Sequence, residues 1–185
     1  MHEEIAIGGF GGQGVLFIGR LLTEAAFHEG HEVAFMPSYG AEKRGGTVWC
    51  HITVSDEKVG SLFILRPTVA IAMNPASLDK FERAVKTNGL LLVNKSLVQV
   101  RVKREDIEVI SVPAIELATE LGDAAASNLV VLGALLSRRP VVSIPGVRDI
   151  LENMSRTRLE SNMKSLEYGY RWAKEQKPPV SKARR

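Results

Sequence analysis

The sequence predicts an α/β domain built on a mostly parallel β-sheet. Short apolar runs, suited to buried strands, alternate along the chain with segments in which apolar residues recur at helical spacing. A glycine-rich turn joins the first of these strands to the first helix, and one longer stretch is rich in β-branched residues. We therefore expect a Rossmann-like three-layer domain with an added antiparallel hairpin and C-terminal helices.

The first strand is expected at residues 4–8, because Glu-Ile-Ala-Ile-Gly is a short apolar run that ends in glycine. From Gly14 onwards apolar residues recur every three or four positions, which predicts a helix that stops at Gly30. Polar and apolar residues alternate sufficiently over residues 31–36 to predict a second strand, which we expect to end at Pro37. This strand–helix–strand order is typical of a parallel sheet.

An antiparallel addition is expected next. A longer strand is predicted at residues 47–54, where polar and apolar residues alternate in the sequence Thr-Val-Trp-Cys-His-Ile-Thr-Val. Residues 55–58, Ser-Asp-Glu-Lys, suit a hairpin turn, which would lead into a second strand at residues 59–65.

The rest of the chain repeats the order of strand and helix. Further strands are expected at residues 68–72, 89–94 and 108–112, and helices at residues 75–85, 113–121, 128–139, 144–155 and 157–175. The last helix carries an apolar stripe, Leu159, Met163, Leu166, Tyr170 and Ala173. Packing of this stripe on the chain's own core is the simpler interpretation. Contact with a partner chain is the alternative, since Tyr168 and Trp172 lie off the stripe.

Composition excludes several classes of protein. The chain has 185 residues, of which 45% are hydrophobic and 24% charged, so it is neither disordered nor fibrous. One cysteine, Cys50, cannot form an internal disulfide or a four-thiolate cluster. No apolar run is long enough to span a membrane, and the first residues lack the layout of a secretory signal. We expect a cytoplasmic protein with no membrane contact.

The net charge of +3 resides in the last nine residues, which hold four cations and no acid. We expect one α/β domain at residues 1–176 and a flexible basic tail at residues 177–185. No stripe of aromatic and basic residues accompanies the tail, so nucleic acid is not an expected partner.

The first candidate site is the turn Gly8-Gly-Phe-Gly-Gly-Gln-Gly14. It contains Gly9-x-Gly11-x-x-Gly14 directly after a strand and before a helix, and such glycines let backbone N–H groups approach a phosphate. A turn that only packs the strand against the helix is the alternative. A nicotinamide cofactor is disfavoured, because the second strand ends in Met36-Pro37 where an acidic residue would hold the ribose.

The second candidate site is the loop at residues 37–47, Pro-Ser-Tyr-Gly-Ala-Glu-Lys-Arg-Gly-Gly-Thr, which should emerge at the same edge of the sheet. Lys43 and Arg44 could hold a phosphate or a carboxylate, with Glu42 pairing with one of them. An interfacial salt-bridge loop or an ordinary charged loop is the alternative. Asn128, at the start of a predicted helix, is either a boundary residue or a ligand contact. The four histidines lack metal-ligand spacing, so no metal site and no catalytic residue is assigned.

With these stretches, and with Asn128-Leu-Val-Val-Leu-Gly-Ala134, the sequence resembles the gamma subunit of the 2-oxoacid:ferredoxin oxidoreductases over about residues 3–175. Ser-Tyr-Gly-Ala-Glu at residues 38–42 looks more like the 2-oxoglutarate and branched-chain branches than the pyruvate branch. The resemblance implies a subunit of an enzyme that converts a 2-oxoacid, coenzyme A (CoA) and oxidised ferredoxin into acyl-CoA, CO2 and reduced ferredoxin.

The resemblance also implies cofactors and partners. Thiamine diphosphate and iron–sulfur clusters would belong to alpha and beta partner chains, which a ferredoxin-like delta subunit can join. This chain would help to bind CoA at the subunit interface, would be inactive alone and could form a homodimer in isolation. The residues that it implicates are Gly11, Gly12, Gln13, Gly14, Ser38, Tyr39, Glu42, Lys43 and Arg44. A stand-alone nucleotide- or CoA-binding regulatory module and a scaffold that binds no ligand are the alternatives.

Overall fold

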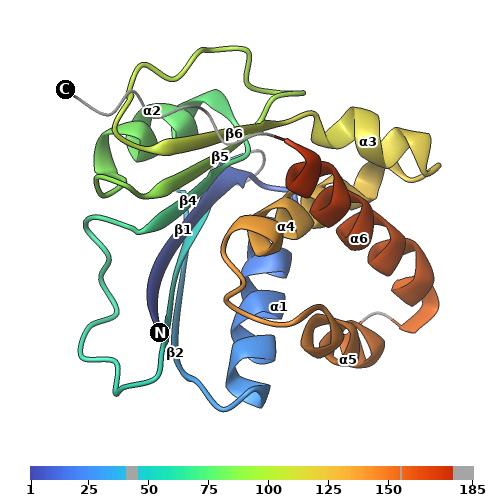
Figure 1. Cartoon of the computed structure of the whole chain (residues 1–185), viewed down its shortest axis with the longest axis horizontal. Helices are drawn as coiled ribbons and strands as arrows, with labels where there is room; N and C mark the ends of the chain where they lie inside the picture. Colours follow the sequence, from blue (N-terminus) through green and yellow to red (C-terminus); the bar gives the residue numbers. More distant parts are fainter. Residues whose placement is uncertain (41–45, 155, 177–185) are drawn as a thin grey trace.

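The computed structural model describes residues 1–40, 46–154 and 156–176, and six strands form one sheet in it (Figure 1). The sheet order is β2-β3-β1-β4-β5-β6. β3 runs antiparallel to both of its neighbours, and the other five strands run parallel to one another. The strands are β1 (His2–Phe10), β2 (Glu32–Tyr39), β3 (Thr47–Ser55), β4 (Val69–Ala72), β5 (Leu90–Asn94) and β6 (Glu108–Val112).

Helices cover both faces of this sheet, as predicted. The helices are α1 (Val15–His28), α2 (Pro75–Ala84), α3 (Ala114–Glu120), α4 (Ser127–Arg138), α5 (Ile144–Met154) and α6 (Leu159–Glu175), with short 3-10 turns at Ala124–Ala126 and Arg156–Arg158. α1, α4, α5 and α6 contribute to one hydrophobic core on one face, and α2 packs on the opposite face (Figure 1). The mostly parallel α/β architecture expected from the sequence is therefore confirmed.

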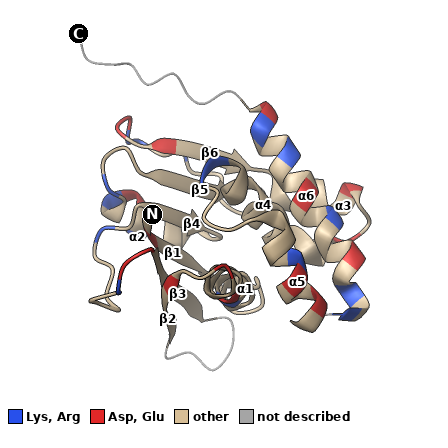
Figure 2. Cartoon of the chain, turned by 60° about the horizontal axis from the view of Figure 1, so that its bottom comes forward, with Lys and Arg blue, Asp and Glu red and all other residues tan. Residues whose placement is uncertain are grey.

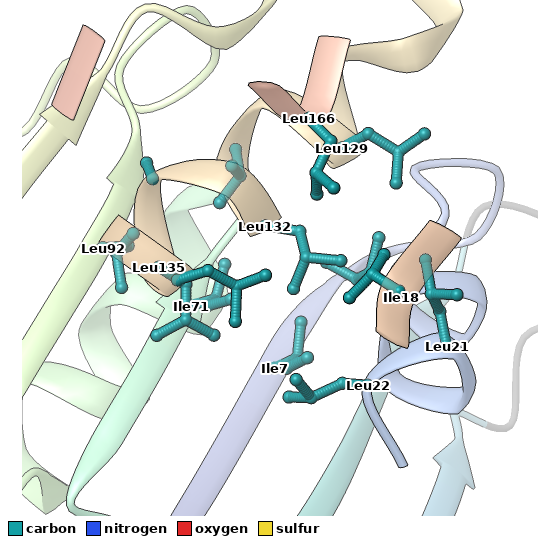
Figure 3. Close-up of a cluster of buried hydrophobic side chains, with 14 of the residues drawn as sticks. Ile7, Ile18, Leu21, Leu22, Ile71, Leu92, Leu129, Leu132, Leu135 and Leu166 are labelled. Atoms are coloured by element: carbon teal, nitrogen blue, oxygen red, sulfur yellow. The ribbon is translucent and has the colours of Figure 1, made fainter. Parts of the chain in front are cut away.

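The larger core forms because the strands and helices place their apolar residues on facing sides. Ile7, Ile71 and Leu92 project from three neighbouring strands and are fully shielded from solvent or nearly so. Figure 3 shows them beside Ile18, Leu21 and Leu22 of α1, Leu129, Leu132 and Leu135 of α4, and Leu166 of α6. Burial of such side chains contributes about 1.5–3 kcal/mol each relative to exposure.

α4 and α6 cross at a pair of glycines. A Cβ atom on Gly133 would collide with the carbonyl oxygen of Leu166, and one on Gly169 would collide with the carbonyl oxygen of Val130. The two backbones therefore touch, which is possible only where both helices lack a side chain. Met163, Leu166 and Ala173 of the α6 stripe are buried here, so the stripe packs on the chain's own core.

Tyr168 and Trp172, the aromatic residues off the α6 stripe, are also half-buried against this core. The Tyr168 hydroxyl donates a hydrogen bond of 2.5 Å to Glu120 Oε2. In the part of the chain that the structure describes, no helix combines the length and the apolar character needed to cross a membrane.

The hairpin predicted from residues 47–54 and 59–65 is wrong, although the sheet does have an antiparallel addition. β3 pairs with β1 on one side and with β2 on the other, so both of its edges are occupied and residues 59–65 form a loop rather than a strand. The hairpin therefore consists of β2 and β3. Pro37 lies within β2 instead of ending it, because β2 is an edge strand and tolerates a residue without an N–H group.

Gly133→Ala or Gly169→Ala should destabilise the fold by about 1–3 kcal/mol or more, because the new methyl group would have to push the backbones of α4 and α6 apart. The midpoint of urea unfolding measures this loss. Gly60→Ala is the matched control, since no atom lies within 4 Å of the added Cβ there. Equal midpoints for all three variants would contradict the close crossing.

Candidate functional site

The glycine turn between β1 and α1 lies at the carboxyl edge of the sheet. Gly12 and Gly14 have φ angles of 93° and 73°, a left-handed conformation that side chains disfavour. Gly14 directly precedes α1, and no side chain caps the helix there. The N–H groups of the first helical turn have no acceptor within the helix, so this end of α1 favours an anion.

Gln13 spans the base of this turn. Its Oε1 accepts a hydrogen bond of 2.6 Å from the N–H of Phe10, and its Nε2 donates one of 3.3 Å to the carbonyl oxygen of Met73. Gly9 must be a glycine here, because an added Cβ would lie only 2.5 Å from Gln13 Oε1. Gln13, a predicted ligand contact, therefore links the loops that follow β1 and β4 and holds the turn in place.

The loop between β2 and β3 contacts the glycine turn where that loop leads into β3. The N–H of Gly11 donates a hydrogen bond of 3.0 Å to the carbonyl oxygen of Gly46, and Gly40 N–H donates one of 2.7 Å to Thr47. The two loops therefore emerge side by side, as the sequence predicts. Glu42, Lys43 and Arg44, the charged candidates, lie outside the described residues.

Ser38 and Tyr39 end β2 next to these loops. Tyr39 stands opposite Val48 of β3, and its side chain is 70% exposed. Ser38 is half-buried and stands opposite Trp49. An exposed aromatic ring beside an anion-favouring turn is suited to stacking on a flat ligand group.

Asn128 joins the glycine turn from a distant part of the sequence. It is a buried residue in the first turn of α4, and its Oδ1 accepts a hydrogen bond of 3.0 Å from the N–H of Leu129. A Cβ added to Gly14 would lie 2.9 Å from Asn128 Cγ, so the amide occupies the space beside that glycine. The N-termini of α1 and α4 thus converge, with the Asn128 side chain between them.

Two further asparagines lie at this edge, and sequence reasoning missed them. Asn74 follows β4, and its Oδ1 caps α2 by accepting a hydrogen bond of 2.8 Å from Ser77 N–H. Asn94 ends β5 and is completely buried. Among the described residues, neither atom of the Asn94 amide nor Asn74 Nδ2 has a hydrogen-bond partner. The sequence shows only that each asparagine directly follows or ends an apolar run, which does not reveal its burial. We expect ordered water at both asparagines.

Electrostatic conditions exclude Cys50 as a nucleophile. Burial raises the pKa of its thiol to about 12, so the thiolate is absent at neutral pH. Burial, and then the nearby Lys80 charge, lower the pKa of His51, with Glu4 opposing them. The Lys80 ammonium lies 4.0 Å from the centre of the Trp49 ring. No group of three metal-ligating side chains occurs in the described residues.

Comparison with known proteins identifies the family. The model of the pyruvate ferredoxin/flavodoxin oxidoreductase family matches residues 4–172. The chain belongs to this family. The ketoisovalerate oxidoreductase subunit VorA of Methanothermobacter marburgensis, a relative, is 36% identical, and the match covers 92% of this chain and 36% of VorA. The chain thus spans about a third of the length of that relative.

Other members of the family differ in length. The 2-oxoglutarate synthase subunit KorC of Methanocaldococcus jannaschii is 30% identical, with 95% of this chain and 96% of KorC covered. A solved 2-oxoglutarate:ferredoxin oxidoreductase from Magnetococcus marinus, with 2-oxoglutarate, coenzyme A and succinyl-CoA bound, superimposes with a TM-score of 0.87 at 20% identity. That match covers 96% of this chain and 32% of the solved chain. The family therefore contains this fold both alone and within longer chains.

Gly14→Ala should cost more stability than Gly12→Ala. Both substitutions strain a left-handed backbone by about 1–2 kcal/mol, but only the Cβ at position 14 also meets Asn128. In an Asn128→Ala background the extra cost should disappear. Urea unfolding of the single and double variants measures this coupling, and a cost at position 14 that is unchanged by Asn128→Ala would refute the contact.

The stability of the protein should fall as pH rises above about 9. The Cys50 thiol has a higher pKa in the folded chain than in the unfolded chain, so the unfolded state loses its proton first and is favoured between pH 9 and 12. The slope should reach about 1.4 kcal/mol per pH unit. Unfolding free energies from pH 8 to 10 measure it, and the same slope in Cys50→Ala would contradict the assignment.

Proposed function

We propose that this chain is the gamma subunit of a multisubunit 2-oxoacid:ferredoxin oxidoreductase. The reaction would convert a 2-oxoacid, CoA and oxidised ferredoxin into acyl-CoA, CO2 and reduced ferredoxin. The observation that carries the proposal is the match to KorC, which extends over nearly the whole of both chains at 30% identity. The names of KorC and VorA favour 2-oxoglutarate or a branched-chain 2-oxoacid as the substrate.

The role proposed for this chain is to help bind CoA at the interface with its partners. The pyrophosphate of CoA is an anion that suits the glycine turn at Gly11–Gly14, where the α1 and α4 N-termini converge. Exposed Tyr39 ends β2, which one strand, β3, separates from β1 and the glycine turn, and its ring is suited to a flat group such as adenine. Lys43 and Arg44 would supply positive charge from the connecting loop.

The remaining chemistry belongs to partner chains under this proposal. With one cysteine, this chain cannot hold a four-thiolate iron–sulfur cluster by itself. We assign the clusters and thiamine diphosphate to alpha and beta subunits, with a ferredoxin-like delta subunit in some complexes. The isolated chain should be inactive and can self-associate, and the complex should work in the cytoplasm with ferredoxin as its electron acceptor.

Reconstitution with alpha and beta subunits tests the proposal. The complex should oxidise 2-oxoglutarate or a branched-chain 2-oxoacid, and omission of this chain should abolish the activity. Lys43→Ala with Arg44→Ala should raise the KM for CoA about 10-fold or more, because a hydrogen bond to a charged group contributes about 1.5–3 kcal/mol. The KM for the 2-oxoacid should change little.

Lys164→Ala, on the exposed side of α6, is the matched charge-removal control and should leave both KM values unchanged. If the isolated chain bound CoA tightly and entered no complex, the stand-alone regulatory module would be favoured instead. An unchanged KM for CoA in the double variant would remove Lys43 and Arg44 from the CoA site.

A further inference from the structure

The sheet face opposite α1 is covered by a helix over only half of its width. α2 packs Leu78 and Phe81 against the central strands β4 and β5. In the described ranges no helix lies over the same face of β2 and β3 (Figure 1). Met36, Ser38 and Trp49 point to this face, because they alternate with core residues along their strands, and all three are half-buried. We name these three residues the open sheet face.

The loop that follows β3 borders the open sheet face and is held down at one point. Ile64 is buried, and its N–H donates a hydrogen bond of 3.4 Å to Nδ1 of His51. His51 stands directly opposite Met36 in the β2–β3 ladder. The loop therefore meets the sheet next to the open sheet face.

The residues around Ile64 are apolar and face solvent. Leu62, Phe63 and Leu65 are 54%, 73% and 86% exposed, and we name them the 62–65 patch. A hydrogen bond of 3.1 Å from Phe63 N–H to Ser61 Oγ shapes the loop locally. Three large apolar side chains within four residues, on a segment anchored by Ile64, are typical of an interaction surface rather than of scattered surface hydrophobics.

The helical face of the molecule has a different character. Both acidic and basic residues lie along α5 and α6, as Figure 2 shows. Such mixed charges suit contact with water. Around the 62–65 patch and the open sheet face the charges are mixed as well, because the Lys80 ammonium lies over the Trp49 ring and both Lys80 and Glu4 act on His51. The exposed apolar side chains, and not a charge of one sign, therefore distinguish this surface.

We propose that the 62–65 patch, together with the open sheet face, is the docking surface for one partner subunit of the oxidoreductase, the chain that corresponds to the remaining two thirds of VorA. The proposal rests on the proposed function. We choose this partner because the match covers only about a third of VorA and of the Magnetococcus marinus chain. In those proteins the shared fold is joined to a further two thirds of polypeptide. A separate subunit needs a surface that holds the corresponding partner without a covalent link.

The test measures assembly of the full chain with the alpha and beta subunits. The double variant Phe63→Ser with Leu65→Ser should bind them at least 100-fold more weakly, because apolar side chains at the centre of an interface carry much of the affinity. Its unfolding midpoint should equal that of the wild-type chain, since both side chains are exposed. Phe27→Ser is the matched control: Phe27 is 66% exposed on α1, against the other face of the sheet, and this variant should assemble normally.

Normal assembly of the double variant, or an equal loss with Phe27→Ser, would overturn the proposal. A homodimer of the isolated chain that the double variant splits, with heteromeric assembly unchanged, would assign the patch to a second copy and would also overturn it. If the wild-type chain failed to join the oxidoreductase subunits at all, the proposed function itself would fall, and this result is distinct from a loss confined to the double variant.

Discussion

The close crossing of α4 and α6 is the contact on which the rest of the structure depends. Every residue of α4 from Asn128 to Leu136 is buried, so this helix lies inside the molecule with the sheet and α1 on one side and α6 on the other. It can take that position only because Gly133 and Gly169 let the two backbones touch. Because α4 lies there, the Asn128 side chain in its first turn is placed beside Gly14. Packing at the α4–α6 crossing and geometry at the glycine turn are therefore linked through one rigid helix.

Local patterns were sufficient to predict the elements but not their pairing. Apolar spacing located α1, α4 and α6 to within about two residues, and β6 was predicted with its observed ends. The strands that pair with β3 were not predictable in the same way. The alternation of polar and apolar residues over 47–54 indicates a strand with two different faces, but it does not indicate which strands lie beside it. The prediction that Pro37 ends the second strand was wrong for a related reason. The free-energy cost of a proline in a strand depends on whether that strand lies at the edge of the sheet, and β2 does.

The candidate site was predictable where backbone conformation leaves a signature in the sequence. Glycines at positions 12 and 14 signal left-handed backbone, and the structure has it. Gln13 was predicted as a ligand contact and stays a prediction in that role. Only the three-dimensional arrangement reveals that it also reaches the loop after β4. Asn74 and Asn94 were missed because an asparagine after a strand is an ordinary turn or cap residue until packing buries it. Their unpartnered amides are a property of the folded chain alone.

The insertion of β3 between β1 and β2 determines the distance between the glycine turn and Tyr39. Phe10 pairs with Thr47 on one side of β3, and Tyr39 pairs with Val48 on the other, so one strand separates the two loop-bearing strand ends. Neighbouring strands lie about 4.8 Å apart, which puts these ends about 10 Å from each other. A single phosphate is too short to reach from the glycine turn to Tyr39. Under the proposed function, a ligand that uses both sites would therefore be elongated, with its charged portion at the glycine turn and its flat portion near Tyr39.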